Sequence, residues 1–206
     1  MTLLFIFDMD DVLYDYDWRA RMMGMSELTG IEFDTLRELW WNERGEWAAE
    51  AGVYRTAEEY LDAFESAIGM SIDEQEWVRI RGGAMTVWPE SIEAVRRASE
   101  LGRVTLLTNN GALAGKHLAT LAPELVEHFG EHLYTSSAYG ARKPDPVVFE
   151  RVLERYGVAA ENAFFADDLE INVAGARSVG ITAHRFTTSA LLLAAVEEFA
   201  ASRSSA

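Results

Sequence analysis

Three acidic residues follow a short apolar stretch near the amino terminus: Asp8, Asp10 and Asp11 come after residues 3–7, LLFIF. Five consecutive apolar residues are typical of a short buried strand. Side chains two apart on a strand point the same way, so we expect Asp8 and Asp10 to share one small space. Carboxylates this close repel each other, and a divalent cation or a shared proton relieves the repulsion. Taken alone, the pattern also fits a plain acidic turn.

Polar side chains also follow three later strands of the predicted series. In a parallel sheet the carboxyl ends of the strands meet at one edge, where open α/β sheets bind their ligands. We therefore expect these groups to converge although they lie far apart in the sequence. They are Thr108, Asn109 and Asn110 after the strand at 104–107, Lys143 after a weak strand at 132–135, and Asp167 and Asp168 after the strand at 163–166.

This set of side chains suits phosphoryl transfer. A carboxylate can act as the nucleophile and form an aspartyl phosphate. A hydroxyl and backbone amides can hold a phosphate, and a lysine supplies a compact positive charge. Grouped carboxylates suit Mg²⁺, which binds one or two of them together with the phosphates of a substrate. Each motif taken alone is weaker evidence for this chemistry than the whole set. Residues 108–110 could also form a plain turn, and Lys143-Pro144 could also be a loop before a helix.

The order of the predicted elements indicates an α/β fold with an insertion. Residues 17–86 predict about four helices and no strand, with one helix running from near residue 34 to Trp47. After Trp88 helices alternate with strands, which predicts a doubly wound parallel sheet, the Rossmann-like arrangement. We expect a core domain of residues 1–13 plus 87–206. A helical domain of residues 14–86 would then lie over the carboxyl edge of the sheet as a cap.

Composition narrows the classes of function. The 206 residues carry a net charge of −16, which disfavours a nucleic-acid partner because such partners require a basic face. The absence of cysteine excludes disulfides, thiolate zinc sites and cysteine nucleophiles. The apolar run at 3–7 is too short for a signal peptide or a membrane span, so we expect a cytoplasmic protein with no membrane partner. Residues 200–206 are small and polar and are expected to fray.

The four motifs together resemble the haloacid dehalogenase superfamily, specifically its phosphatase branch with a helical cap inserted after the first strand. That family has DxD after the first strand, Thr or Ser after the second, a lysine commonly followed by proline, and an acidic pair after the fourth. The resemblance spans the whole chain. The matching segments are Asp8-Met-Asp10, Thr108-Asn109, Lys143-Pro144 and Asp167-Asp168.

The resemblance implies a role for each matching residue. Asp8 would be the nucleophile and a Mg²⁺ ligand, and Asp10 would protonate the leaving group, activate water and bind the metal through its backbone carbonyl. Thr108 and the Asn109 amide would hold the phosphate, and Lys143 would neutralise Asp8 and the phosphate. The acidic pair would complete the metal site, braced by an asparagine four residues beyond it. These last residues are Asp167, Asp168 and Asn172.

Two positions depart from the family pattern. Asp11 stands where glycine is usual after DxD, which requires a backbone conformation that an L-residue can adopt. Ala166 precedes the acidic pair in place of a glycine. The resemblance implies a phosphatase acting on a small soluble phosphomonoester, with Arg44, Arg55 and nearby aromatic residues as candidates for contacting a sugar phosphate.

Three other functions remain open from the sequence. A sugar phosphomutase of the same superfamily uses the same aspartyl phosphate, and the sequence does not separate it from a phosphatase. A phosphoacceptor signalling domain would carry similar acids, although the predicted cap helices disfavour it. The third is a catalytically silent binding protein, which the intact motifs disfavour. The dehalogenase branch lacks the second aspartate, so Asp10 argues against it. The oligomeric state is not predicted.

Overall fold

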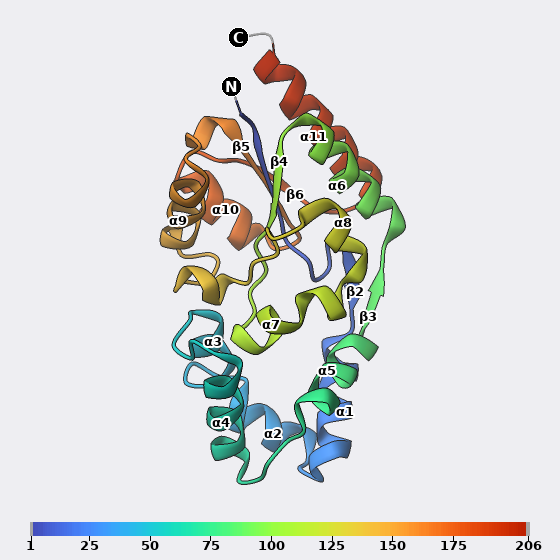
Figure 1. The fold of residues 1–206 in the computed structure, drawn as a ribbon, viewed down its shortest axis with the longest axis vertical. Helices are drawn as coiled ribbons and strands as arrows, with labels where there is room; N and C mark the ends of the chain where they lie inside the picture. The colour runs from blue at the N-terminus through green and yellow to red at the C-terminus, as the bar shows by residue number, and fades with distance from the viewer. Residues whose placement is uncertain (1, 205–206) are drawn as a thin grey trace.

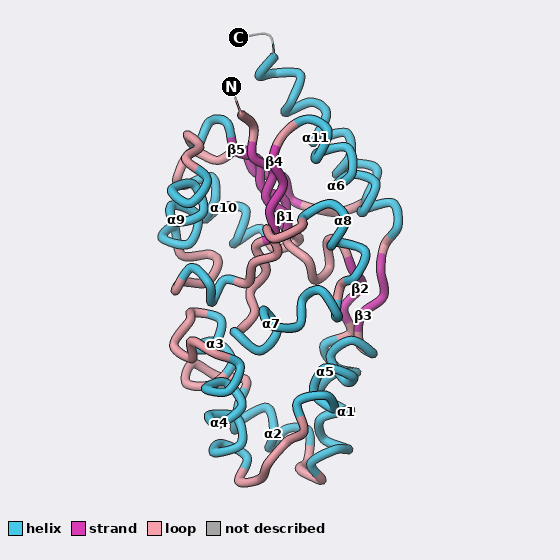
Figure 2. The backbone as a smooth tube through the Cα atoms, in the orientation of Figure 1, coloured by secondary structure: helices cyan, strands magenta, loops and turns pink. Residues whose placement is uncertain are grey.

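The computed structural model of the chain describes residues 2–204, and within them the main sheet has four parallel strands (Figures 1 and 2). Their order across the sheet is β4-β1-β5-β6, so the first strand lies in the interior. The predicted α/β fold with a parallel sheet is therefore confirmed. The strands are β1 (Leu4–Phe7), β4 (Arg103–Leu106), β5 (Ala163–Asp167) and β6 (Thr182–Arg185).

Helices cover both faces of this sheet, which explains why β1 is apolar at every position. Leu4 and Ile6 pack on one side of the sheet, whereas Phe5 and Phe7 pack on the other. Figure 1 shows α6 and α11 on one side and α9 and α10 on the other. These helices are α6 (Pro89–Leu101), α9 (Pro146–Tyr156), α10 (Glu170–Ser178) and α11 (Ser189–Ser204).

A group of helices between β1 and β4 packs around a hydrophobic cluster of its own, which includes Trp40, Tyr60, Phe64 and Trp77. Figure 1 places this group at the pole of the molecule opposite the two termini. We call it the inserted helices. They are α1 (Trp18–Thr29), α2 (Phe33–Trp40), α3 (Glu46–Glu50), α4 (Ala57–Ile68) and α5 (Glu74–Gly83).

The two connections between the inserted helices and the sheet pair with each other. β2 (Tyr14–Tyr16) and β3 (Met85–Val87) form a two-stranded antiparallel ribbon. The prediction that residues 17–86 contain no strand is therefore wrong at its carboxyl end. Three-residue strands give little periodic signal in a sequence, and this pairing joins segments about 70 residues apart.

The predicted helix through Trp47 is also wrong, because the chain breaks between α2 and α3. The Asn42 side chain accepts hydrogen bonds from the backbone N–H groups of Arg44 and Gly45, which draws the chain into a turn. A Cβ atom at Gly45 would lie 2.0 Å from the carbonyl oxygen of Trp40, so only glycine fits there. The local hydrogen bonds of Asn42 therefore outweigh the helical spacing of the aromatic residues.

The weak strand predicted at 132–135 does not form, although this segment runs beside β4. Leu106 N–H donates to the carbonyl of His132, and Ser136 N–H donates to the carbonyl of Thr108. Between these two bonds the described residues form only an isolated bridge, from Thr108 to Thr135. The segment lies at the edge of the sheet with one neighbouring strand, so a regular ladder is not enforced.

Five further helical elements complete the described chain. Residues 126–129 pack against β4, and residues 112–121 pack against α4 and α5 of the inserted helices. The five elements are α7 (Ala112–Leu121), η1 (Pro123–Leu125), α8 (Val126–Phe129), η2 (Ser136–Tyr139) and, before β5, η3 (Ala160–Asn162).

The last helix extends further than predicted. α11 continues to Ser204, so residues 200–204 are helical rather than frayed, and positions 205 and 206 lie outside the described residues. Among the helices of residues 2–204, none combines the length and the apolar character needed to cross a bilayer.

The core around β1 yields a stability prediction. Phe5 is fully buried, and its ring contacts those of Phe164 and Phe199. We expect Phe5→Ala to lower the free energy of unfolding by about 3–5 kcal/mol, because it removes a large apolar side chain and leaves a cavity. Leu191→Ala, on the exposed side of α11, should change it by less than about 0.5 kcal/mol. Urea denaturation of both variants tests this, and equal losses would contradict it.

Candidate active site

The predicted polar residues meet at the carboxyl edge of the sheet because three strands end there side by side. β1 pairs in parallel with β4 on one side and with β5 on the other. The pairing continues past β1, where Leu107 N–H donates to Phe7 and Asp8 N–H donates to Ala166. Asp8 therefore lies beside the end of β5, where Asp167 stands, and opposite the residue before Thr108.

Lys143 is the centre of the site. Its side chain is 1% exposed, and its ammonium lies 2.8 Å from Asp8 Oδ1 and 2.6 Å from Asp167 Oδ2. Burial alone would lower the pKa of Lys143, but the charges of Asp167 and Asp8 outweigh it and raise that pKa above its ordinary value. The lysine therefore remains charged while it is enclosed by protein. It ties the end of β1 to the end of β5.

Asp167 is fixed by several donors. Asn172, on α10, donates to both of its carboxylate oxygens at 3.0 and 3.1 Å, and the backbone N–H of Leu169 donates to Oδ1 at 2.9 Å. Burial acts to raise the pKa of Asp167, but the ammonium of Lys143 together with these hydrogen bonds holds it below its ordinary value. Asn172 thus lies where the resemblance puts it, bracing the loop after β5.

The residues after β4 lie close to the same point. Thr108 is buried, and its hydroxyl accepts a hydrogen bond from the Asn110 side chain at 2.9 Å. The Asn109 side chain donates to the backbone carbonyl of Lys143 and accepts from its backbone N–H, both at 2.9 Å. Asn109 therefore uses its side chain to position the lysine loop, a contact that the sequence did not indicate.

Asp10 has a different charged partner from Asp8, and its negative charge acts on Asp8. One nitrogen of Arg81, Nη2, lies 2.7 and 2.8 Å from the two oxygens of Asp10. Arg81 belongs to α5 of the inserted helices, and the sequence analysis missed it. One feature of the sequence could have indicated that Arg81 is buried. Arg81 comes four residues after Trp77, so both lie on the same buried face of α5.

The residue in the usual glycine position adopts the conformation that glycine favours. Asp11 has a φ of 57°, in the left-handed region that aspartate and asparagine enter more readily than other L-residues. Its backbone N–H donates to the carbonyl of Tyr14 at 2.7 Å, which closes the turn. The substitution of aspartate for glycine at this position is therefore accommodated.

The acidic groups at this edge exceed the positive charge beside them. Carboxylate oxygens of Asp8, Asp167 and Asp168 all lie within 4.8 Å of one another, against the single ammonium of Lys143. Burial raises the pKa of Asp8 well above its usual range, and burial together with Asp167 raises the pKa of Asp168 to about 6. A divalent cation bound by oxygen ligands would relieve this repulsion, so the residues present fit a Mg²⁺ ion.

The inserted helices also contact the loops of the site on the side away from β2 and β3. Glu50 Oε2, at the end of α3, lies 2.6 Å from Arg142 Nε, next to Lys143 in the chain. Ser136 donates its hydroxyl hydrogen to the carbonyl of Glu50 at 2.7 Å. A Cβ atom at Gly111 would lie 2.9 Å from the ring of Tyr60, so α4 approaches the start of α7 closely. The inserted helices are therefore seated against the loops after β4 and before α9.

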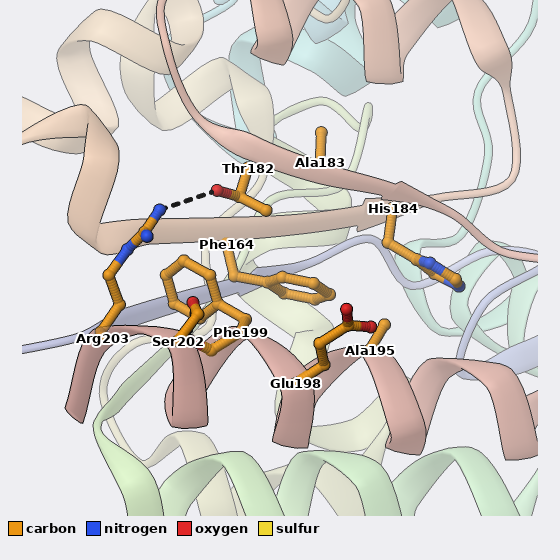
Figure 3. Close-up of a pocket in the computed structure, with 9 residues that line it drawn as sticks. All are labelled: Phe164, Thr182, Ala183, His184, Ala195, Glu198, Phe199, Ser202 and Arg203. Carbon is orange, nitrogen blue, oxygen red and sulfur yellow. Dashed lines mark hydrogen bonds between the residues drawn. The ribbon is translucent and has the colours of Figure 1, made fainter. Parts of the chain in front are cut away.

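A separate pocket lies along the edge strand of the sheet. Figure 3 shows it between β5, β6 and α11, with Phe164 and Phe199 lining it and Arg203 bonded to Thr182. Its volume is about 300 Å³, and it contains none of the residues of the acidic cluster. The chemistry indicated by the motifs is therefore located at the carboxyl edge, not in this pocket.

Comparison with known families agrees with this geometry. Residues 2–180 match the haloacid dehalogenase-like hydrolase family. The chain belongs to this family. It is 26% identical over 186 residues to the phosphatase MT3486 of Mycobacterium tuberculosis, covering 87% of this chain and 84% of that protein. It is 24% identical over 200 residues to a ribulose-1,5-bisphosphate 5-phosphatase of Halopiger xanaduensis, covering 88% and 83%.

Solved structures share the fold. The enzyme BT-2542 of Bacteroides thetaiotaomicron, a haloacid dehalogenase family member in complex with magnesium and inorganic phosphate, superposes with a TM-score of 0.75. The identity is 22%, and the match covers 91% of this chain and 95% of that one. A 2-haloacid dehalogenase of Pseudomonas syringae gives 0.64 at 18% identity, covering 98% and 100%. This hydrolase therefore has the haloacid dehalogenase fold over nearly its whole length.

Glu50 yields a prediction about pH. Burial, with the nearby charge of Glu46, raises the pKa of Glu50 to about 7 despite Arg142. The folded state therefore binds more protons than the unfolded state between about pH 4 and 7, so this group lowers stability as pH rises through that window. The loss in the free energy of unfolding caused by Glu50 should reach about 3 kcal/mol and stay constant above pH 7.

Urea unfolding at several pH values from 5 to 8 measures this effect. Glu50→Gln cannot titrate, so its stability relative to the wild-type protein should increase from pH 5 to 7 and then level off. Contributions of titrating groups that do not interact with Glu50 cancel in this difference. A constant difference between the two proteins across the range would contradict the prediction.

Proposed function

We propose that this hydrolase is a magnesium-dependent phosphatase that cleaves a small phosphomonoester through an aspartyl phosphate on Asp8. The observation that carries the proposal is the pair of short contacts from Lys143 to Asp8 and Asp167 within the acidic cluster. In this arrangement Asp8 would be the nucleophile, Lys143 would supply a cation, and the carboxylates would hold a metal ion, all at one point. The names of the Mycobacterium and Halopiger relatives, both phosphatases, support it.

The proposed first step breaks the bond between phosphorus and the leaving oxygen. A carboxylate oxygen of Asp8 attacks phosphorus, and the carboxyl group of Asp10 gives its proton to the departing alcohol. The hydroxyl of Thr108 and the backbone amide of Asn109 bind the oxygens of the phosphoryl group, and Lys143 balances their charge.

The proposed second step regenerates the enzyme. Water attacks phosphorus, the carboxylate of Asp10 takes a proton from that water, and the bond from phosphorus to Asp8 breaks. Inorganic phosphate leaves, and Asp8 is again a carboxylate. One residue thus acts as acid and then as base, in steps that need opposite protonation states.

The residues that would hold Mg²⁺ are Asp8, Asp167 and Asp168, together with the backbone carbonyl of Asp10. When bound, the ion would neutralise negative charge on the phosphate and align it with the nucleophile. The excess of carboxylates over ammonium groups supports its binding. Asn172 would keep Asp167 oriented for this purpose.

We also propose that residues 14–86 form a cap domain over a core of residues 1–13 and 87–206. Supporting this division, the inserted helices have their own hydrophobic cluster and join the sheet through the β2–β3 ribbon. The cap would exclude water during the first step. The substrate of the Halopiger relative is by its name a sugar bisphosphate, so we infer that sugar phosphates are the substrates to test first.

Replacement of the nucleophile tests the proposed function. We expect Asp8→Asn to reduce phosphate release at least about a thousandfold, because the amide cannot form the covalent intermediate. Circular dichroism should show an unchanged fold. Asp15→Asn, an exposed carboxylate on β2, is the matched control and should keep wild-type activity. Substantial turnover by Asp8→Asn would rule out the proposal.

The metal site is tested by chelation. Removal of divalent ions with EDTA should abolish phosphate release, and Mg²⁺ should restore it. We expect Asp168→Asn to raise the Mg²⁺ concentration for half-maximal activity about 10- to 100-fold. Calorimetric titration of Mg²⁺ should show the same weakening independently of activity. Turnover that EDTA leaves unchanged would argue against this metal.

A screen of sugar phosphates, other alkyl phosphates and p-nitrophenyl phosphate would identify the substrate class. Measuring free phosphate alongside isomerised sugar phosphate separates a phosphatase from a phosphomutase. Stable phosphorylation by a small phosphodonor without turnover would instead indicate a phosphoacceptor protein.

A further inference from the structure

Arg81 connects the inserted helices to the loop that carries the proposed nucleophile. It lies in the last turn of α5, yet its side chain is only 1% exposed. Its Nη2 atom bonds both oxygens of Asp10, which is 20% exposed and sits 71 residues earlier in the chain. A charged hydrogen bond of this length is strong and directional. The direction of the Asp10 carboxyl group is therefore set by a residue outside the sheet.

The position of Arg81 is itself fixed by the ribbon that joins the two parts of the molecule. Its guanidinium lies over the ring of Tyr16 on β2, with its central carbon 3.8 Å from the ring centroid. The Tyr16 hydroxyl accepts a hydrogen bond from Arg21 of α1 at 3.2 Å, and Tyr16 pairs with Met85 of β3. Arg81 is thus held against β2, which in turn pairs with β3.

Two further nitrogens of this guanidinium are enclosed without a hydrogen-bond partner among the described residues. They are Nε and Nη1 of Arg81. A buried cation with unpaired donors is costly, and an apolar side chain at such a position is often as stable or more so. Stability alone therefore accounts poorly for an arginine at position 81. Its contact with Asp10, which orients that carboxyl group, accounts for it better.

We propose that Arg81 is a positioning residue that aims the carboxyl group of Asp10 at the leaving oxygen of the substrate. This inference rests on the proposed function, because Asp10 is the acid and base of that reaction. Proton transfer requires the donor and the acceptor at hydrogen-bond distance, and a displacement of about 1 Å can cost about a hundredfold in rate. In this role Arg81 itself exchanges no proton, and it acts through its contact with Asp10.

The experiment compares two probes that differ in their need for an acid. Glycerol phosphate releases an alkoxide that must be protonated, whereas p-nitrophenyl phosphate releases a stable anion. We expect Arg81→Gln to slow the single-turnover cleavage of glycerol phosphate about 10- to 100-fold and that of p-nitrophenyl phosphate less than about threefold. The substrate concentration for half-maximal rate should change little for either probe. Arg81→Lys should recover part of the lost rate.

A matched control lies two residues away on the same helix. Arg79 is exposed and pairs with Glu76 on α5 itself, so Arg79→Gln should leave both single-turnover rates at the wild-type value. Circular dichroism and the melting temperature establish that each variant is folded under the assay conditions.

A double-mutant cycle determines whether Arg81 acts through Asp10. If it does, adding Arg81→Gln to Asp10→Asn should produce no further loss in the cleavage of glycerol phosphate. Urea unfolding of the same four proteins should also show non-additive losses, because both single substitutions remove the same ion pair. Additive losses in either measurement would overturn the inference.

Other outcomes separate this inference from the proposed function. If the wild-type protein and Arg79→Gln cleave both probes and Arg81→Gln matches or exceeds them, only the positioning role fails. Equal slowing of both probes, or a large rise in the half-saturating substrate concentration, would show that Arg81 binds the phosphate instead and would also overturn it. If neither the wild-type protein nor Arg79→Gln releases phosphate, the proposed function fails. The coupling between Arg81 and Asp10 is then measured by urea unfolding of the four proteins alone.

Discussion

The ion pairs of Lys143 with Asp8 and Asp167 are the interaction on which the arrangement of the site depends. A lysine that is 1% exposed requires negative charge beside it, since an unpaired buried ammonium would cost several kcal/mol. The two carboxylates come from the ends of different strands. The lysine can therefore be buried only when β1 and β5 are paired in register and the loop before α9 reaches across their ends.

This requirement links the fold to the chemistry. The backbone carbonyl and N–H of Lys143 are both bonded by the Asn109 side chain, so the loop after β4 holds the lysine from the other side. Three strand ends are thus joined around one ammonium. The same contacts leave Asp168 and the remaining oxygens of Asp8 and Asp167 gathered at one point, where a cation is favourable.

Much of this site could be predicted from the sequence because each of its strand ends is marked by residues that are close together in the chain. A short apolar run indicates where a buried strand ends, and parallel strands place their ends on one edge, so Asp8 and Asp167 could be assigned to the same location. Arg81 could not be assigned in this way. Its contact with Asp10 depends on how α5 packs, and no local rule links residues 71 positions apart.

The same distinction explains the errors in the predicted fold. Helical spacing of the aromatic residues around Trp47 was real, but the side-chain hydrogen bonds of Asn42 and the tight approach at Gly45 interrupt the helix. The β2–β3 pairing and the irregular segment at 132–135 depend on neighbours that are distant in the chain. Strand termini and caps are encoded locally, whereas partners across the fold are not.

The β2–β3 ribbon limits how the inserted helices can separate from the sheet. Both covalent connections run through it, and residues 14, 15 and 16 pair with 87, 86 and 85, so the two connections cannot lengthen independently. On the opposite flank, in Figure 1, α3 meets the loop before α9 through the Glu50–Arg142 contact and not through a continuous chain. A rotation of the inserted helices about the ribbon would break the Glu50–Arg142 contact, whereas Tyr16, which lies on the ribbon, would move little.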